Sequence, residues 1–115
     1  MPIPSLFDNR LTLPLIAAPM FLASGPELVT ACCKAGIVGT FPAKNQRTTD
    51  GLEAWLDQIT TDLKDHEQAT GKPATPFGVN LIVHKSNDVL ADELALCKKY
   101  NVPLIITSLG AVSDL

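Results

Sequence analysis

Four short apolar runs end in small or uncharged polar residues, and these residues are the ones whose types and spacing could do chemistry. Residues 18–20 close the run "LPLIAAPMF", residues 41–43 close the run that begins "GIVGTF", Asn80 stands inside "FGVNLIV", and residues 107–110 close "VPLIITSLG". If the runs are parallel strands, their carboxyl ends form one rim, which is where such folds bind ligands. This rim would offer backbone amides, hydroxyls and one amide side chain, with almost no charge. It suits a flat, largely apolar ring, whereas a metal needs clustered His, Asp or Glu.

Asn80 is the most informative single residue. An amide inside an apolar strand is costly to bury unless its donors and acceptors are satisfied, so it either bonds neighbouring groups or contacts a ligand. His84 follows the same strand, within reach of the mouth of the rim, although a lone histidine is weak evidence for catalysis. His66 falls in a polar stretch of a predicted helix and is expected to be exposed.

The elements that must position these residues alternate between strands and helices. Ser24 is a candidate N-cap with Pro26 at the first helical position, and Gly36 can end this first helix. Thr49 can cap a second helix that runs to about residue 69, and Ser86 or Asn87 can open a third. One face of the second helix is apolar at helical spacing, at Leu52, Trp55, Leu56, Ile59 and Leu63. Strands are predicted over residues 13–20, 36–41, 77–83 and 102–110.

This order predicts an α/β fold with a parallel sheet, because strands that alternate with helices are joined by right-handed crossovers. The strands are apolar throughout, which is typical of parallel sheets. Four such βα units are half of a TIM (β/α)8 barrel, whose usual length is about 250 residues. We therefore expect residues 1–115 to form the N-terminal half of a barrel and to be a fragment of a longer chain. A four-stranded open sheet is the alternative, and it would leave an apolar face or edge to be covered.

Composition excludes several classes of function. The chain has 115 residues, 46% of them hydrophobic, and a net charge of −3. Its Lys and Arg residues are scattered, so no nucleic-acid footprint is expected. No apolar run approaches the roughly 20 residues of a membrane helix, and no targeting signal is present. Cys32, Cys33 and Cys97 lack metal-ligand spacing and are expected to be free thiols in a reducing cytoplasm. Phosphate-binding glycine motifs and the GxSxG elbow are also absent.

Several of these segments occur together in a known order. "LPLIAAPMF", "SGPELVTACCKAGIVGTFPAKN", "PFGVNLIV" and "VPLIITSLG" resemble the N-terminal half of the nitronate monooxygenase family, formerly called 2-nitropropane dioxygenases. The resemblance covers about residues 11 to 112. It implies a TIM barrel that binds FMN and oxidises alkyl nitronates with dioxygen to carbonyl compounds and nitrite. Two alternatives remain: another FMN barrel such as an enoyl-acyl carrier protein reductase, and a non-catalytic half-barrel that self-associates as a homo-oligomer.

The resemblance also assigns residues to the site. It places the cofactor against Ala18, Pro19, Met20, Asn80, Thr107 and Ser108. It places the substrate pocket beside Phe41, Pro42 and Asn45, with His84 at the mouth of the rim. The family's catalytic histidine and its phosphate loops would lie beyond Leu115, so neither histidine of this chain takes the catalytic role. We therefore expect residues 1–115 alone to bind FMN weakly at best and to show no turnover.

Overall fold

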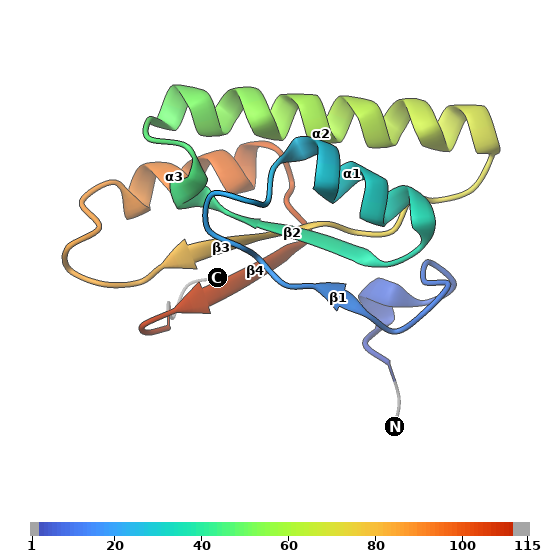
Figure 1. The fold of residues 1–115 in the computed structure, drawn as a ribbon, viewed down its shortest axis with the longest axis horizontal. Helices are drawn as coiled ribbons and strands as arrows, with labels where there is room; N and C mark the ends of the chain where they lie inside the picture. Colours follow the sequence, from blue (N-terminus) through green and yellow to red (C-terminus); the bar gives the residue numbers. More distant parts are fainter. Residues whose placement is uncertain (1–2, 112–115) are drawn as a thin grey trace.

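The computed structural model describes residues 3–111, which fold into a single sheet with three helices (Figure 1). Two short 3-10 helices, η1 (Ser5–Phe7) and η2 (Ala43–Asn45), complete the set. The main elements follow in the order β1 (Ile16–Ala17), α1 (Pro26–Ala35), β2 (Val38–Pro42), α2 (Thr49–Thr70), β3 (Gly78–Ile82), α3 (Leu90–Lys99) and β4 (Leu104–Ser108). The predicted alternation of strands and helices is thus confirmed.

The sheet has the strand order β1-β2-β3-β4, and every neighbouring pair is parallel. Each crossover therefore steps one strand in the same direction. Right-handed crossovers of this kind put their helices on one side of the sheet, and α1, α2 and α3 all lie on the same face (Figure 1). None of α1, α2 and α3 covers the other face, which we call the uncovered face, although Val38 and Thr40 of β2 are almost fully buried on it. The α/β class with parallel βα units is confirmed.

Strand β1 is much shorter than the predicted strand over residues 13–20. The chain makes a tight turn at Pro14, where the Leu15 amide donates to the Leu13 carbonyl at 2.8 Å. Pairing with β2 ends at Ala17, shortly before Pro19, which has no N–H to donate to a strand ladder. The apolar run was therefore a poor guide to strand length, because two prolines interrupt its hydrogen bonding.

Helix α1 begins and ends largely as predicted, but its cap differs. Pro26 is its first residue, and Gly36 ends it in the left-handed conformation with φ 92°. The N-cap is Gly25, which makes no side-chain cap bond. Ser24 was the predicted cap, but its hydroxyl instead accepts a hydrogen bond from the Met20 amide at 2.9 Å. The Ser24 hydroxyl therefore stabilises the loop before α1 and does not cap the helix.

The starts of the other two helices also differ from the prediction. Helix α2 is capped by Thr48, whose hydroxyl accepts from the Gly51 amide at 3.0 Å, one residue before the predicted Thr49. Helix α3 begins at Leu90, later than predicted: the Ser86 hydroxyl contacts the His84 ring, and the Asn87 amide donates to the Ile82 carbonyl at the end of β3 and to Glu93 inside α3. No helix in the described part of the chain is long and apolar enough to cross a membrane.

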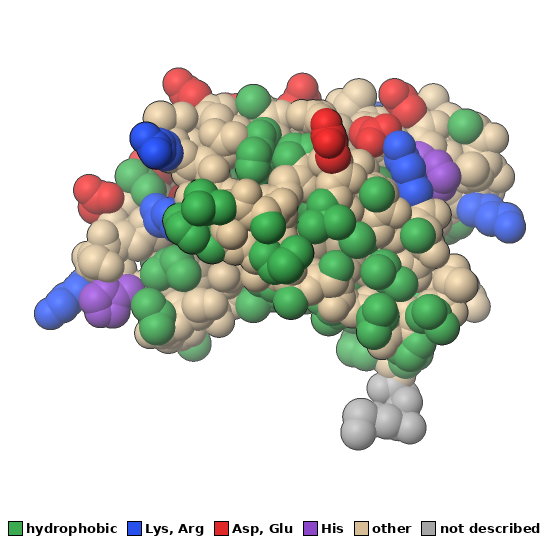
Figure 2. All heavy atoms as spheres, viewed as in Figure 1, with side chains coloured by type: hydrophobic (Ala, Val, Ile, Leu, Met, Phe, Trp, Pro, Cys, Tyr) green, Lys and Arg blue, Asp and Glu red, His purple; other side chains and the backbone are tan. Residues whose placement is uncertain are grey.

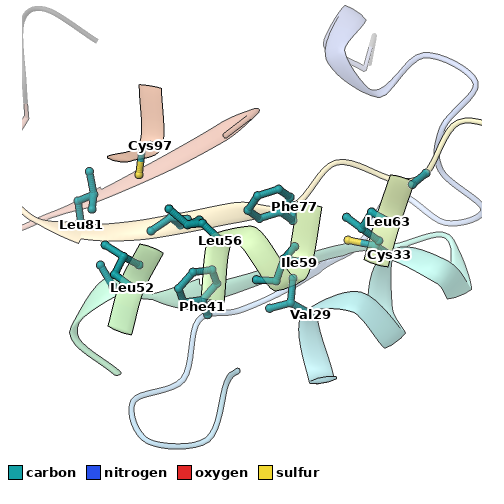
Figure 3. Packing of buried hydrophobic residues seen from close by; sticks show 13 residues of the cluster. Val29, Cys33, Phe41, Leu52, Leu56, Ile59, Leu63, Phe77, Leu81 and Cys97 are labelled. Carbon is teal, nitrogen blue, oxygen red and sulfur yellow. The ribbon is translucent and has the colours of Figure 1, made fainter. Parts of the chain in front are cut away.

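The hydrophobic core lies between the sheet and the three helices (Figure 3). The predicted stripe of α2 is its centre, since Leu52, Leu56 and Ile59 are almost fully buried. Trp55 flanks the core and meets Phe41 of β2 edge-on, with ring centroids 5.6 Å apart. Charged side chains lie mainly along the helices and at the ends of the molecule, whereas hydrophobic ones gather around β1 and the N-terminal segment (Figure 2).

Two core thiols make the fold sensitive to alkaline pH. Burial raises the pKa of Cys33 and of Cys97 from 9.0 to about 11. The folded chain therefore keeps protons that the unfolded chain loses, so this stability is full below pH 9 and is lost as the pH rises to 11. Each thiol contributes about 3 kcal/mol to this effect. We expect the urea midpoint to fall between pH 9 and 11. The Cys33→Ala/Cys97→Ala variant should show a flatter pH dependence; an unchanged slope would contradict the assignment.

Candidate functional site

The pleat of the sheet decides which strand residues face the candidate site. Val79, Leu81 and Ile105 pack in the core with the helices, so their neighbours along each strand lie on the uncovered face. The parallel register places the uncovered-face residues side by side across the strands. These residues carry no charge: Thr40, Pro42, Asn80, Ile82, Ile106 and Ser108.

Asn80 and Ser108 form a polar pair on this face. The Ser108 hydroxyl donates to the Asn80 side-chain oxygen at 2.9 Å. Asn80 is opposite Ile106 in the register, so Ser108 is the next residue of β4 on the same face. No group among residues 3–111 accepts a hydrogen bond from the Asn80 amide nitrogen, and the side chain is only half-buried. The structure therefore satisfies the oxygen of Asn80 and leaves its N–H donors available to a ligand.

Two residues assigned to the site by resemblance face the other way. Phe41 is fully buried in the core beside Trp55, so its ring does not line a pocket on the uncovered face. Thr107 is opposite Leu81 and shares its side of the sheet, so only Ser108 of the pair lies beside Asn80. The resemblance assigned neighbouring residues of a strand end to the same pocket, but successive residues of a strand point to opposite faces of the sheet.

The loop after β1 is held in one shape by its own hydrogen bonds and by Asn45. The Met20 amide donates to the Ser24 hydroxyl, and the Met20 carbonyl accepts from the amides of Ala23 and Ser24. The Asn45 side chain donates to the carbonyls of Met20 and Ser24 at 3.0 and 2.7 Å. Asn45 therefore positions this loop, and the Met20 backbone has little capacity left to bond a ligand.

This loop presents hydrophobic side chains to the surface. Met20, Phe21 and Leu22 are 47%, 67% and 81% exposed. Leu22 has a φ of 64°, a conformation that a leucine rarely adopts, and its amide donates to the Asn45 side-chain oxygen at 2.9 Å. Asn45 thus fixes a strained, apolar loop tip next to the predicted rim. The apolar residues of this loop are evident in the sequence. The conformation of the loop depends on Asn45 of η2, which is distant in the sequence.

His84 lies at the predicted mouth but folds back on its own loop. Its Nδ1 accepts from the Ser86 amide at 3.1 Å and lies 2.8 Å from the Ser86 hydroxyl. The ring is exposed, and no bond joins it to Asn80 or Ser108 in the described part of the chain. The structure therefore places His84 apart from the polar pair.

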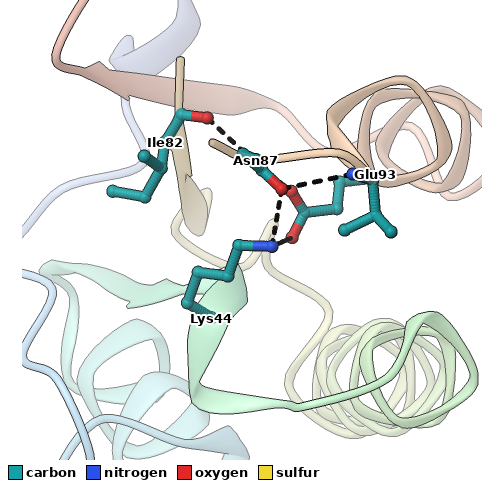
Figure 4. A network of polar contacts seen from close by, with 5 residues as sticks. Lys44, Ile82, Asn87 and Glu93 are labelled. Carbon is teal, nitrogen blue, oxygen red and sulfur yellow. Dashed lines mark hydrogen bonds and ion pairs between the residues drawn. The ribbon is translucent and has the colours of Figure 1, made fainter. Parts of the chain in front are cut away.

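A buried polar network at the ends of β2 and β3 was not anticipated from the sequence (Figure 4). Lys44 donates to the Asn87 oxygen at 2.7 Å and lies 3.5 Å from the Glu93 carboxylate, which is only 3% exposed. The Asn87 amide in turn donates to the Ile82 carbonyl and to Glu93. The network ties η2, the end of β3 and the start of α3 together. Its members are polar residues in separate segments, a pattern that no local motif reveals.

We expect Lys44→Met to destabilise the fold by about 2 to 3 kcal/mol, because it leaves the buried Glu93 carboxylate without its cation. The half-exposed position of Lys44 admits water and keeps the loss below that of a fully buried pair. Urea unfolding measures it. The control is Lys99→Met, whose ammonium pairs with Glu53 at the surface, where a smaller loss is expected. Equal losses in the two variants would contradict a structural role for the Lys44 network.

The pockets formed by the described residues lie away from the polar pair. Five stand out on residues 3–111, and neither Asn80 nor Ser108 lines any of them. A single sheet face has no opposing wall, so a ring bound there would be open on one side. No group of three His, Cys, Asp or Glu residues within the described range could hold a metal ion.

Comparisons of the chain with protein-family models, with curated proteins and with solved structures find no match.

Proposed function

We propose that the uncovered face binds the flavin ring of FMN, and that the protein acts as an oxidoreductase on alkyl nitronates. The reaction would consume dioxygen and give a carbonyl compound and nitrite. The observation that supports the cofactor is the Asn80–Ser108 pair, with an available amide donor on an uncharged face. The substrate follows from the resemblance of the strand and loop segments to nitronate monooxygenases.

The residues of this face fit the flavin ring better than they fit its phosphate. The ring edge carries carbonyl and nitrogen acceptors that the Asn80 N–H groups can reach, and Ile82 and Ile106 offer apolar surface on the same face. Lys44 is the cation nearest the rim in sequence, in η2 directly after β2, but Asn87 and Glu93 already engage it. In this proposal other parts of the protein hold the phosphate.

The arrangement of helices supports a half-barrel as the finer fold. All three helices lie on one side, and the strand order is strictly sequential, as in a closed (β/α)8 barrel. In this proposal further strands pair with the edges of β1 and β4 and turn the uncovered face inward. Closure would supply the missing wall of the site and exclude water from the ring.

The residues of this chain would orient the cofactor rather than react. FMN supplies the redox chemistry when it is bound. Asn80 donates to the ring, Ser108 holds the Asn80 amide in one orientation, and Asn45 keeps the loop at residues 18–22 in shape beside it. A nitronate is already the deprotonated form of a nitroalkane, so the proposed reaction needs no base from this chain to remove a proton from the substrate.

Titration of FMN with the chain tests the proposal, with flavin fluorescence as the readout. We expect weak, saturable quenching, and no nitrite release from propyl nitronate by residues 1–115 alone. Lumichrome, which has the ring without the ribityl phosphate, should compete with FMN if the ring is the group recognised. Absence of saturable quenching, or competition by inorganic phosphate but not by lumichrome, would contradict a ring site.

A non-catalytic, self-associating module is a second candidate, and the β1 edge favours it. Leu13, Leu15 and Ile16 are each more than half exposed there, and exposed apolar residues beside an unpaired strand edge favour association. Light scattering at several concentrations separates the candidates. A stable dimer that does not bind FMN would favour self-association, whereas a monomer that binds FMN would favour the cofactor site.

A further inference from the structure

The largest of the described pockets lies at the opposite end of the sheet from the proposed flavin site. It has a volume of about 510 Å³, within the range of small-molecule sites. The segment at residues 9–12 forms one wall, the carboxyl ends of α1 and α2 form a second, and residues 72–75 form a third. We call it the amino-end pocket, because it lies where β2 and β3 begin.

The amino-end pocket is lined by cations and hydroxyls. Arg10, Lys34 and Lys72 line it together with three threonines and the His66 ring, and no Asp or Glu is among its lining residues. This lining is unusual for a chain whose net charge is −3. Figure 2 shows Lys or Arg and His side chains at the end of the molecule where α2 ends, with Asp or Glu side chains next to them.

The helices that end here do not account for these cations. Lysine and arginine often bond the last carbonyls of a helix, but glycines already do so in this fold. The Gly36 amide donates to the Cys32 and Cys33 carbonyls of α1, and the Gly71 amide donates to the Glu67 carbonyl of α2. The cations are therefore not required as caps.

Arg10 is held in place with part of its guanidinium uncommitted. Its Nε donates to the Ala74 carbonyl at 3.1 Å, and its own carbonyl accepts from the Thr75 hydroxyl at 2.6 Å. Within residues 3–111, no acceptor engages the two terminal nitrogens of Arg10, and Lys72 forms no ion pair. Lys34 contributes less, because Asp62 pairs with it at 2.9 Å. A planar, positioned guanidinium is the group that best recognises phosphate.

We propose that the amino-end pocket binds a soluble small molecule that carries phosphate groups. Arg10 and Lys72 contact the phosphate, and the threonine hydroxyls complete its hydrogen bonds. This site is independent of the proposed flavin function, because no residue is shared between the pocket and the uncovered face.

Calorimetric titration with pyrophosphate tests the site. We expect saturable binding that weakens as ionic strength rises, and at least about tenfold weaker binding in Arg10→Gln. Lys72→Gln should also weaken pyrophosphate binding. Lys72 is exposed and forms no ion pair within residues 3–111, so this substitution should leave the fold intact. The control is Lys98→Gln, an exposed lysine of α3 outside the pocket, which should leave the affinity unchanged.

Three results would overturn the proposal. The first is no saturable binding of pyrophosphate. The second is an equal loss of affinity in the Lys98 control, which would indicate only diffuse attraction. The third is Arg10-dependent binding to vesicles with anionic phospholipid and none to pyrophosphate, which would identify a lipid headgroup as the phosphate instead. Circular dichroism shows whether Arg10→Gln is still folded, so that weaker binding is not mistaken for unfolding. Lys72→Gln tests the same site with Arg10 left in place.

Discussion

Gly39→Ala is expected to destabilise the fold by about 3 kcal/mol, because α1 packs directly on the backbone of β2 at this position. A Cβ at Gly39 would lie 2.5 Å from the Val29 carbonyl oxygen and 2.9 Å from the Val29 Cα. Both contacts are with helix backbone, which cannot rotate away as a side chain does. Relief requires α1 to move off the sheet, which strains the core as other overpacked substitutions do. Urea unfolding at neutral pH measures the loss.

Gly71→Ala is the matched control for this prediction. Gly71 has a φ of 68°, and no atom lies within 4 Å of the position where its Cβ would be. Its substitution therefore carries only the cost of a left-handed alanine, about 1 kcal/mol. A Gly39→Ala loss no larger than that of Gly71→Ala would show that α1 and β2 are not in backbone contact, and the packing described above would be incorrect.

Asn80→Leu is expected to weaken FMN binding by at least about tenfold, because it removes the hydrogen bonds that the amide donates to the ring. The same change should leave the free energy of unfolding equal or slightly higher. Leucine keeps the branched shape of asparagine and removes a polar group from a half-buried position on the open face. Fluorescence titration and urea unfolding of one preparation give both quantities. This combination separates a ligand contact from a structural role, in which stability would fall as well.

Ser108→Ala and His84→Gln are the companions of this variant. Ser108→Ala removes the hydroxyl that donates to the Asn80 oxygen, so it should weaken FMN binding less than Asn80→Leu does. His84→Gln should leave the affinity unchanged, because His84 bonds within its own loop. An effect of His84→Gln as large as that of Asn80→Leu would move the ligand toward the β3–α3 loop and away from the proposed position.

The order and type of the elements could be predicted from the sequence, because each depends on local periodicity. The apolar face of α2 and the glycine that ends α1 are examples, because each signal involves residues of a single helix and its immediate end. Element boundaries were less accurate where a side chain had two possible partners. The Ser24 hydroxyl could cap α1 or bond the Met20 amide, and only the path of the loop decides between them.

Asn80 stays a predicted site residue, and it can be singled out from the sequence because an amide stands inside an otherwise apolar strand. Phe41 and Thr107 face the helices rather than the uncovered face, because successive residues of a strand point to opposite sides of the sheet. The role of Asn45 and the Lys44–Glu93 pair depend on contacts between segments far apart in the chain, and nothing in either segment alone indicates its partner.

The most direct test of the central claim is an NMR titration of the ¹⁵N-labelled chain with FMN. If the flavin ring lies on the uncovered face, the side-chain NH₂ signals of Asn80 shift first, together with backbone amides of residues 106–108. Signals from the helical side, such as those of Leu56 and Ile59, stay in place. Shifts confined to the amino-end pocket, or no shift at Asn80 at saturating FMN, would contradict a flavin site on this face.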